Sequence, residues 1–206
     1  MSRTKAFTLI ELLIVVAIIA ILAAIAVPNF LEAQTRSKVT RAKADIRTLA
    51  TALESYAIDY NKYPGDGAQY CWNYGIYPYD GYWYVPDTIT TPIAYITSAK
   101  LVDPFRVVVL TTSLNYRRYR YWYIDMTWGK AGTRPAPSSV LPFLKMWYGS
   151  WKLNSAGPDR TYGPSYPTSS YPGNMYSDLP IPYDATNGTV SSGDVMRSQA
   201  DSGGIK

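Results

Sequence analysis

The chain begins with a long apolar segment, KAFTLIELLIVVAIIAILAAIAVPNF (Lys5–Phe30), in which Glu11 is the one acidic residue. Within it, Phe7–Val27 is apolar except at Thr8 and Glu11. A helix of this length spans about 30 Å at roughly 1.5 Å per residue, the hydrocarbon thickness of a bilayer. A carboxylate inside such a helix is costly unless another group pairs with it. The sequence therefore predicts a membrane-spanning helix in which Glu11 has a partner.

The residues that flank this segment predict its orientation. Arg3 and Lys5 precede it, which favours a cytoplasmic N-terminus and places the rest of the chain across the membrane. A secretory signal peptide is the alternative, but its apolar stretch is about 7–15 residues long and ends at a small-residue cleavage site. This segment is longer and continues into an amphipathic helix, so we favour the membrane span.

The helix is expected to continue well beyond the apolar segment. Pro28 removes a backbone donor and predicts a bend or a local break. After it, apolar or small residues recur at alternating spacings of three and four, which is typical of one helical face. These residues are Val39, Ala42, Ile46, Leu49, Leu53, Tyr56 and Tyr60. Turn formers and a proline in Asn61–Gly65 end the pattern, so the sequence predicts one helix from about Phe7 to Tyr60.

Composition changes after Gly65, where Pro, Gly, Tyr and Thr replace the helical periodicity. Segments rich in β-branched and aromatic residues predict strands. The candidate strands are Phe105–Leu110, Tyr116–Asp125 and Met146–Leu153, and Ile93–Ala99 is a candidate helical or turn segment. We therefore expect an α+β fold in which a small antiparallel sheet packs on the long helix and the C-terminal part is rich in loops.

The residue content argues against an enzyme. The chain has no His and one Cys, Cys71, which excludes a Ser-His-Asp triad, a Cys-His pair, a His-ligated zinc and an internal disulfide. Carboxylate or Ser-Lys chemistry stays formally open, but no nucleophile and base are recognisable as a set. Whether Cys71 is a free thiol or pairs between subunits stays open. A membrane-anchored enzyme therefore ranks third, below the hypotheses of a structural subunit and of a binding subunit.

Two aromatic stretches, Tyr70–Val85 and Asn115–Asp125, suggest a binding surface. Interleaved Arg and Tyr can stack on nucleic-acid bases, and Tyr and Trp also form sugar platforms and protein interfaces. In the second stretch the residues alternate with period two, which predicts a strand with Tyr packed on the helix and Arg facing solvent or a neighbouring subunit. A net charge of +5 is too small for an electrostatic argument, so we do not expect nucleic acid as a partner.

A short basic leader, Ala6 and the pentapeptide FTLIE (Phe7–Glu11) together resemble the class III signal of type IV pilins and type II secretion pseudopilins. The resemblance implies that a prepilin peptidase cuts the Ala6–Phe7 bond and methylates the new N-terminus. The family more often has Gly where this chain has Ala6. Pro28 resembles the proline at which pilin helices bend or melt in filaments.

This resemblance implies a partner for Glu11. Cleavage would create an α-ammonium at Phe7, about one helical turn from Glu11 and within reach of a neighbouring subunit. In low dielectric such a pair is strong, while either member alone is expensive. Glu11 is then a docking residue that holds an incoming subunit in register. The alternative is a carboxylate that stays hydrated at the headgroup level.

Later segments resemble the major pseudopilin of type II secretion systems. They are YAIDYNKYP (Tyr56–Pro64), TTPIAYITSAKLVDPF (Thr90–Phe105) and NSAGPDRTYG (Asn154–Gly163). In that family the last loop binds calcium, so the resemblance implies calcium ligands at Asp159 and at Asp194, with carbonyl groups completing the six to eight oxygens that calcium takes. The alternative is two turns stabilised by Asp hydrogen bonds to their own backbone.

The sequence therefore predicts four parts: a leader (1–6), a transmembrane or filament-core helix (7–27), the amphipathic half of that helix (28–62) and a globular head (63–206). The leading hypothesis is a pilin-like structural subunit, most like a major pseudopilin, which polymerises from the inner membrane and supports protein secretion. The alternative is a surface pilus or minor subunit whose aromatic head binds surfaces, sugars or DNA.

The same hypothesis predicts partners and location. Expected partners are further copies of the chain, other pilin-like subunits, the prepilin peptidase, an inner-membrane assembly platform and the membrane. We expect a single-pass inner-membrane protein with a cytoplasmic N-terminus that then enters a periplasmic or extracellular filament.

Overall fold

A computed structural model of the chain describes residues 7–66, 84–106, 117–124, 140–160, 183–184, 186, 191 and 193–200. Within these residues a long helix packs on a three-stranded antiparallel sheet, which confirms the expected α+β fold. The elements are α1 (Leu9–Tyr60), the 3₁₀ turn η1 (Asp87–Ile89), β1 (Arg120–Tyr123), α4 (Val140–Tyr148), β2 (Trp151–Ser155) and β3 (Val195–Ser198).

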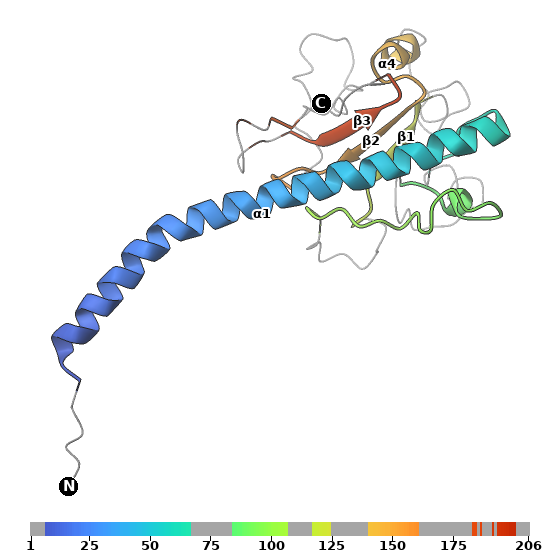
Figure 1. The fold of residues 1–206 in the computed structure, drawn as a ribbon. Helices are drawn as coiled ribbons and strands as arrows, with labels where there is room; N and C mark the ends of the chain where they lie inside the picture. Colours follow the sequence, from blue (N-terminus) through green and yellow to red (C-terminus); the bar gives the residue numbers. More distant parts are fainter. Residues whose placement is uncertain are drawn as a thin grey trace, which may run out of the picture.

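Helix α1 is a single element of 52 residues. Its C-terminal end lies at Tyr60, as predicted, and Asn61 closes it with a positive φ of 52°, a conformation that Asn tolerates. Pro28 lies inside the helix without interrupting it. Because Pro28 has no N–H to donate to the carbonyl of residue 24, one helical hydrogen bond is missing there. The predicted bend is a gentle curve of the N-terminal half in this structure (Figure 1).

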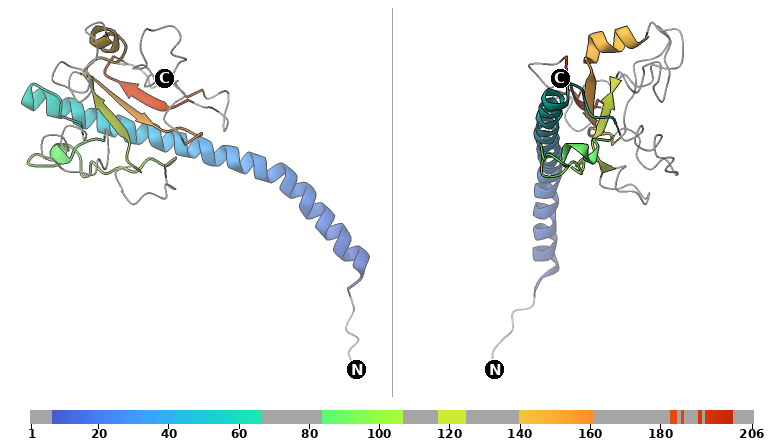
Figure 2. Two further views of the ribbon diagram at one scale, coloured as in Figure 1. Left: turned by 180° about the vertical axis from the view of Figure 1, so that it is seen from behind. Right: turned by 90° about the vertical axis from the view of Figure 1, so that its right-hand side faces the viewer.

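The sheet has the order β1-β2-β3, with β2 in the centre. Tyr121 pairs with Leu153, and Leu153 pairs in turn with Arg197. One face of the sheet lies against the C-terminal half of α1, while α4 lies on the side away from it (Figure 2). The head is therefore built on the second half of α1, and the first half extends away from it (Figure 1).

The core lies between α1 and the sheet. The buried residues of α1 begin at Val39 and include Ile46 and Leu53, the face that the three-four spacing predicts. They pack against the sheet and the segment before it, through side chains that are also buried. These partners are Val85, Ile89, Tyr119, Tyr121, Trp151, Leu153 and Val195. All of the described core therefore lies at or beyond Val39.

Two of the strands predicted from the sequence differ from what the structure shows. In Met146–Leu153, residues 146–148 belong to α4 and only the last three belong to β2. The whole segment is apolar and aromatic, so strand propensity alone did not show the boundary, which Gly149 makes with a φ of 72°. In Phe105–Leu110, Phe105 and Arg106 lie outside any strand, and the other four residues are outside the described part of the chain. The predicted strand at Tyr116–Asp125 is confirmed as the shorter β1.

Candidate assembly site

Glu11 is hydrogen-bonded to its own helix N-terminus. Its Oε2 accepts from the Thr8 backbone N–H at 2.9 Å and from the Thr8 hydroxyl at 2.6 Å. The Thr8 Oγ1 in turn accepts from the Glu11 N–H at 3.3 Å, which completes a capping box. Within a single chain the carboxylate therefore has a local partner, and the sequence analysis missed it. The Thr-x-x-Glu spacing at Thr8–Glu11 was the signal that could have shown it.

The apolar half of α1 has no cover within the chain. The large apolar side chains from Phe7, which is 71% exposed, to Leu31, which is 53% exposed, are all exposed. Among the described residues, α1 is the one helix long and apolar enough to cross a membrane, with a mean hydropathy of 3.1 and no buried residue in its most apolar window. This surface needs a bilayer or other helices around it, because a monomer in water would expose it.

Beyond residue 41, three acidic residues on α1 bind aromatic side chains of the head. The Tyr119 hydroxyl donates to Asp45 Oδ2 at 2.8 Å, and Trp151 Nε1 donates to Glu54 Oε1 at 2.9 Å. The Tyr95 hydroxyl donates to Asp59 Oδ2. These contacts fix the rotation of the head about the helix, because each acid accepts from a different segment of the head.

Tyr63 extends this contact across the end of the helix. Its hydroxyl donates to Glu54 Oε2 at 2.8 Å and accepts from Gln199 Nε2 at 2.7 Å, just after β3. Burial, together with the hydrogen bond to Glu54 and the negative charge of Glu54, raises the pKa of Tyr63 to about 12. The neutral phenol therefore joins α1 to the last strand.

Arg118 is the main correction to the predicted two-faced strand. The hydroxyl of Tyr119 reaches α1, and Tyr121 is fully buried, so the prediction that Tyr packs on the helix is confirmed. The Arg118 side chain, however, is 4% exposed and does not face solvent. Trp122 is also buried, with Lys152 Nζ 3.5 Å from its ring centroid. On the side of β1 opposite Tyr121, Trp122 is therefore covered, whereas Arg120 is half-buried.

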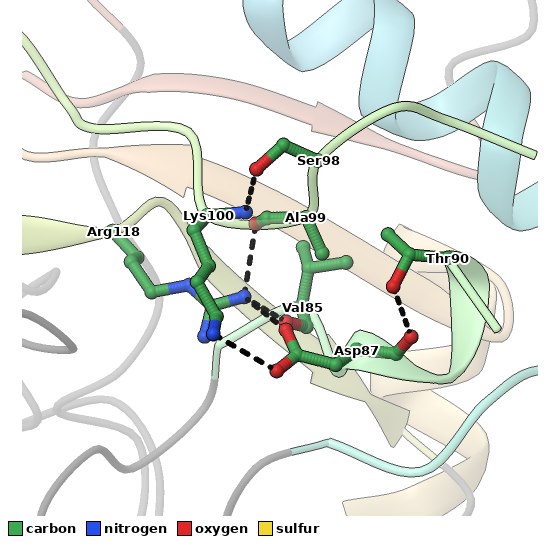
Figure 3. A network of polar contacts seen from close by, with 7 residues as sticks. All are labelled: Val85, Asp87, Thr90, Ser98, Ala99, Lys100 and Arg118. Carbon is green, nitrogen blue, oxygen red and sulfur yellow. Dashed lines mark hydrogen bonds and ion pairs between the residues drawn. The ribbon is translucent and has the colours of Figure 1, made fainter. Parts of the chain in front are cut away.

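The Arg118 guanidinium joins two parts of the segment that precedes the sheet (Figure 3). Its Nη2 donates to the carbonyl oxygens of Val85 at 2.6 Å and Ala99 at 2.9 Å, and it lies 3.4 Å from Asp87 Oδ1. Burial lowers the pKa of Arg118, while the negative charge of Asp87 opposes that shift. Lys100 Nζ lies 3.3 Å from the other oxygen of Asp87, so the two cations share one carboxylate.

A cluster of cationic residues lies on α1 between residues 36 and 47, just after the exposed apolar half of the helix. We call Arg36, Lys38, Arg41, Lys43 and Arg47 the basic segment. Arg36 pairs with Glu32 at 2.5 Å and Arg41 with Asp45 at 3.7 Å. Lys38, Lys43 and Arg47 form no ion pair with the described part of the chain. The basic segment is therefore only partly neutralised within one subunit.

The two expected metal ligands come from adjoining turns. A Cβ added at Gly157 would lie 2.3 Å from the carbonyl oxygen of Gly193, so the turn before Asp159 touches the segment that carries Asp194. Asp159 is exposed, whereas Asp194 is 1% exposed and its Oδ2 accepts from Asn154 Nδ2 at 3.0 Å. Among the residues that the structure describes, no three acidic, Cys or His side chains form a group that could hold a metal ion.

The other predicted site residues are placed only in part. Phe7 is exposed and precedes the helix, and Pro28 lies within it. Ala6, and with it the expected cleavage bond, lies outside the described residues, as does Cys71. The first aromatic stretch is described only at Tyr84 and Val85, so its predicted role is not addressed by the structure.

Comparisons with known proteins agree with the N-terminal geometry. Residues 1–27 match the prokaryotic N-terminal methylation motif, and residues 29–70 match the family described as type II secretion system (T2SS), protein G. The two matched regions cover all of α1 except Pro28, and the second continues past the end of the helix. No solved structure matched the chain significantly.

Similar curated proteins are of two kinds. The type IV major pilin protein PilA of Myxococcus xanthus is 54% identical over 61 residues, 30% of this chain and 28% of the relative. The type II secretion system core protein G of Pseudomonas aeruginosa is 48% identical over 62 residues, 30% of this chain and 44% of the relative. The type IV wide pilus major component PilA4 of Thermus thermophilus is 48% identical over 68 residues, 33% of this chain and 52% of the relative. The matches thus span between about a quarter and a half of the relatives' own lengths.

Proposed function

We propose that the chain is a type IV pilin-like structural subunit of a filament that assembles from the inner membrane. The observation that carries this proposal is the division of α1. From Leu9 to Val27 it exposes apolar side chains and one capped acid, and its second half carries the head. Such a subunit buries its apolar half first in lipid and then among the helices of other subunits.

Within this class we favour a pseudopilus that supports type II secretion. The support is the protein G match over residues 29–70. The resemblance of Thr90–Phe105 and Asn154–Gly163 to the major pseudopilin, which lies beyond that match, adds to it. The second candidate is a surface type IV pilus, which is favoured by the similarity to major pilins. Length and abundance of filaments on intact cells separate the two, because a pseudopilus should not extend far from the cell surface.

Assembly would begin with cleavage of the Ala6–Phe7 bond and methylation of the new amine by a prepilin peptidase. The capping box then suggests an order of events for Glu11. Thr8 keeps the carboxylate hydrogen-bonded while the subunit is alone in the membrane. The Phe7 α-ammonium of the same or a neighbouring copy then adds a full charge to this site, which is worth most in low dielectric.

Substitution of Glu11 tests this proposal. We expect Glu11→Ala to leave membrane insertion intact and to abolish or strongly slow assembly, because the amine of an incoming subunit loses its acceptor. Leu13→Ala is the control, since it shortens an exposed apolar side chain in the same segment without removing charge. Membrane fractionation and electron microscopy of filaments give the two readouts. Normal filaments from Glu11→Ala would reject the docking role, and a mature chain that still begins at Met1 would reject processing.

We also propose a calcium ion at the turns that carry Asp159 and Asp194. Its support is the contact between those turns and the buried Oδ1 of Asn154, which has no hydrogen-bond partner within the described residues. Calcium takes oxygen ligands, and Asp159, Asp194 and Asn154 offer such atoms from three segments. When bound, the ion would tie the turn after β2 to the segment before β3.

Thermal unfolding of the full chain in detergent micelles tests the ion. Chelation should lower the melting temperature of the wild type, and calcium should restore it, because the ion binds only the folded head. Asp159→Ala should remove this response, whereas Glu32→Ala, an acid on the exposed helix far from these turns, should keep it. A wild type whose melting temperature ignores chelation would exclude the metal.

A further inference from the structure

Two neighbouring cations of the basic segment have no acidic partner within the described part of one subunit. Lys43 and Arg47 lie four residues apart on α1, the spacing at which like charges repel across one helical turn. Neither forms an ion pair with the described residues, and Arg47 is exposed. The acids of α1 nearest to them are engaged elsewhere, since Asp45 already accepts from Tyr119 and lies beside Arg41.

The distal end of the same helix has the opposite character. Asp59 is an exposed carboxylate that accepts from the Tyr95 hydroxyl and forms no ion pair within the described part of the chain. Beside it, Ile58 is 82% exposed, the largest exposed fraction among the large hydrophobic side chains of the described residues. An uncompensated acid and a bare apolar side chain at one point of the surface indicate a contact with another molecule.

We propose that Asp59 of one copy of this chain docks between Lys43 and Arg47 of a second copy. The inference rests on the proposed function, since it requires the subunits to stand parallel in one filament. The surface around the two cations suits Ile58, because Thr40 and Ala44 are exposed and small. The Thr40 hydroxyl donates to its own helix at the Arg36 carbonyl, so it offers a methyl group to a neighbour.

An anionic membrane surface is the competing partner, and the length of the helix argues against it. Lys43 and Arg47 follow Leu31, the end of the exposed apolar half, by about 18 Å and 24 Å at roughly 1.5 Å per residue. The headgroup layer on each side of a bilayer is only about 5–8 Å thick. With the helix upright, both cations therefore lie above the headgroups and more than a Debye length from the hydrocarbon boundary.

The proposed contact also fixes how two subunits are offset. Asp59 lies about 14 residues beyond the midpoint of Lys43 and Arg47, so two parallel helices would be displaced by about 21 Å along their axes. The pair between Glu11 and a Phe7 amine needs a displacement of only about 6 Å. The two contacts therefore join a subunit to different neighbours, and the filament is held at both ends of α1.

Cysteine cross-linking tests the proximity directly. In a Cys71→Ser background, a chain that carries both Arg47→Cys and Asp59→Cys should form a ladder of covalent multimers when assembled filaments are oxidised. Chains with only one of the two substitutions should give no ladder. Filaments that form normally but yield no ladder from the double variant would overturn the proposal and leave the proposed function intact. A wild-type chain that never forms filaments would instead refute the proposed function.

Charge reversal tests the energetics. Asp59→Lys would face two cations, so we expect filament yield to fall about tenfold or more, the effect of placing like charges together at an interface. Adding Lys43→Glu and Arg47→Glu to Asp59→Lys should restore the yield, which also shows that these chains fold. Lys38→Glu makes the same charge change as Lys43→Glu on another side of the helix, so it is the matched control for the basic segment and should assemble normally. Unchanged assembly of Asp59→Lys would refute the contact.

The membrane alternative has its own readout. The unassembled Lys43→Glu, Arg47→Glu variant should bind vesicles rich in phosphatidylglycerol as well as the wild type does. The opposite result has two parts: this variant loses vesicle binding, and the chain with Asp59→Lys, Lys43→Glu and Arg47→Glu recovers no filaments. That result would show that the basic segment binds lipid and that the proposed subunit contact is wrong.

Discussion

The guanidinium of Arg118 is the residue on which the segment before the sheet depends. It is almost fully buried and binds the carbonyl oxygens of Val85 and Ala99, which lie 33 and 19 residues before it in the chain. Removing a buried cation of this kind leaves its acceptors without donors in a place that water does not reach. One side chain therefore holds together a region whose described residues, 84–106, include one short 3₁₀ turn, η1.

We predict that Arg118→Met lowers the free energy of unfolding by about 3 kcal/mol, the usual cost of removing one member of a buried polar cluster. Lys100→Met is the control, because Lys100 contacts the same carboxylate from an exposed position and should change stability by less than about 0.5 kcal/mol. Urea unfolding of the full chain in micelles, followed by Trp fluorescence, measures both. Equal stability of the two variants would show that the Arg118 contacts contribute little.

At the scale of elements, Tyr63 connects the end of α1 to the residue after β3, through Glu54 and Gln199. Its pKa in the fold is raised to about 12 from 10.0 because burial and Glu54 disfavour the phenolate. A raised pKa means that the folded state holds the proton longer than the unfolded chain does. The stability that Tyr63 contributes is therefore fully present below about pH 10 and is lost as the pH rises from about 10 to about 12.

Comparison with Tyr63→Phe isolates this effect from the other tyrosines, which titrate in both chains. The wild type should be more stable than Tyr63→Phe at pH 8, by about 1 kcal/mol for the lost hydrogen bonds. The difference should shrink between pH 10 and pH 12. Denaturant unfolding at a series of pH values measures it. A difference that stays constant over this range would mean that Tyr63 ionises normally in the fold.

The elements also show what the sequence could and could not predict. The signals for α1 are local: an unbroken apolar run, a three-four spacing and turn formers after Tyr60 placed both its limits and its buried face. No local signal in the sequence marked the start of β2, because aromatic and apolar residues continue from α4 into the strand. For β1 the spacing of Tyr119 and Tyr121 predicted the face on the helix, but the burial of Arg118 depends on carbonyl groups that only the fold brings near.

The residues of the candidate site also fall into two groups, those that local sequence could predict and those that only the fold brings together. The positions of Glu11 and Pro28 follow from the pattern of the apolar run, since both are defined by neighbours within one or two helical turns. The proximity of the turns before Asp159 and Asp194 could not be derived from spacing, because residues about 35 positions apart meet there only through the pairing of β2 with β3. Unpaired charges on α1 likewise became visible only once the partners of Asp45, Glu54 and Asp59 were known.

At the scale of the whole molecule, the chain consists of two parts with different solvent requirements. The first half of α1 exposes mostly apolar side chains, while the described core of the head begins at Val39. Lipid or other helices must surround the first part, whereas the described core residues of the second part are buried among themselves. A filament subunit needs this division, because its anchor leaves the membrane for the filament while the head stays folded.

This division predicts that the head folds without the anchor. A chain that begins at Glu32 should be a monomer in water and should melt within about 2 °C of the full chain in micelles, because removing residues without core contacts changes stability by under about 0.5 kcal/mol. A chain that begins at Lys43 removes the buried Val39 and Ala42 and should melt clearly lower. Size-exclusion chromatography and near-ultraviolet circular dichroism measure assembly state and melting. If the Glu32 chain aggregates or melts as low as the Lys43 chain, the head needs the apolar helix to fold, and extraction from the membrane would have to unfold it.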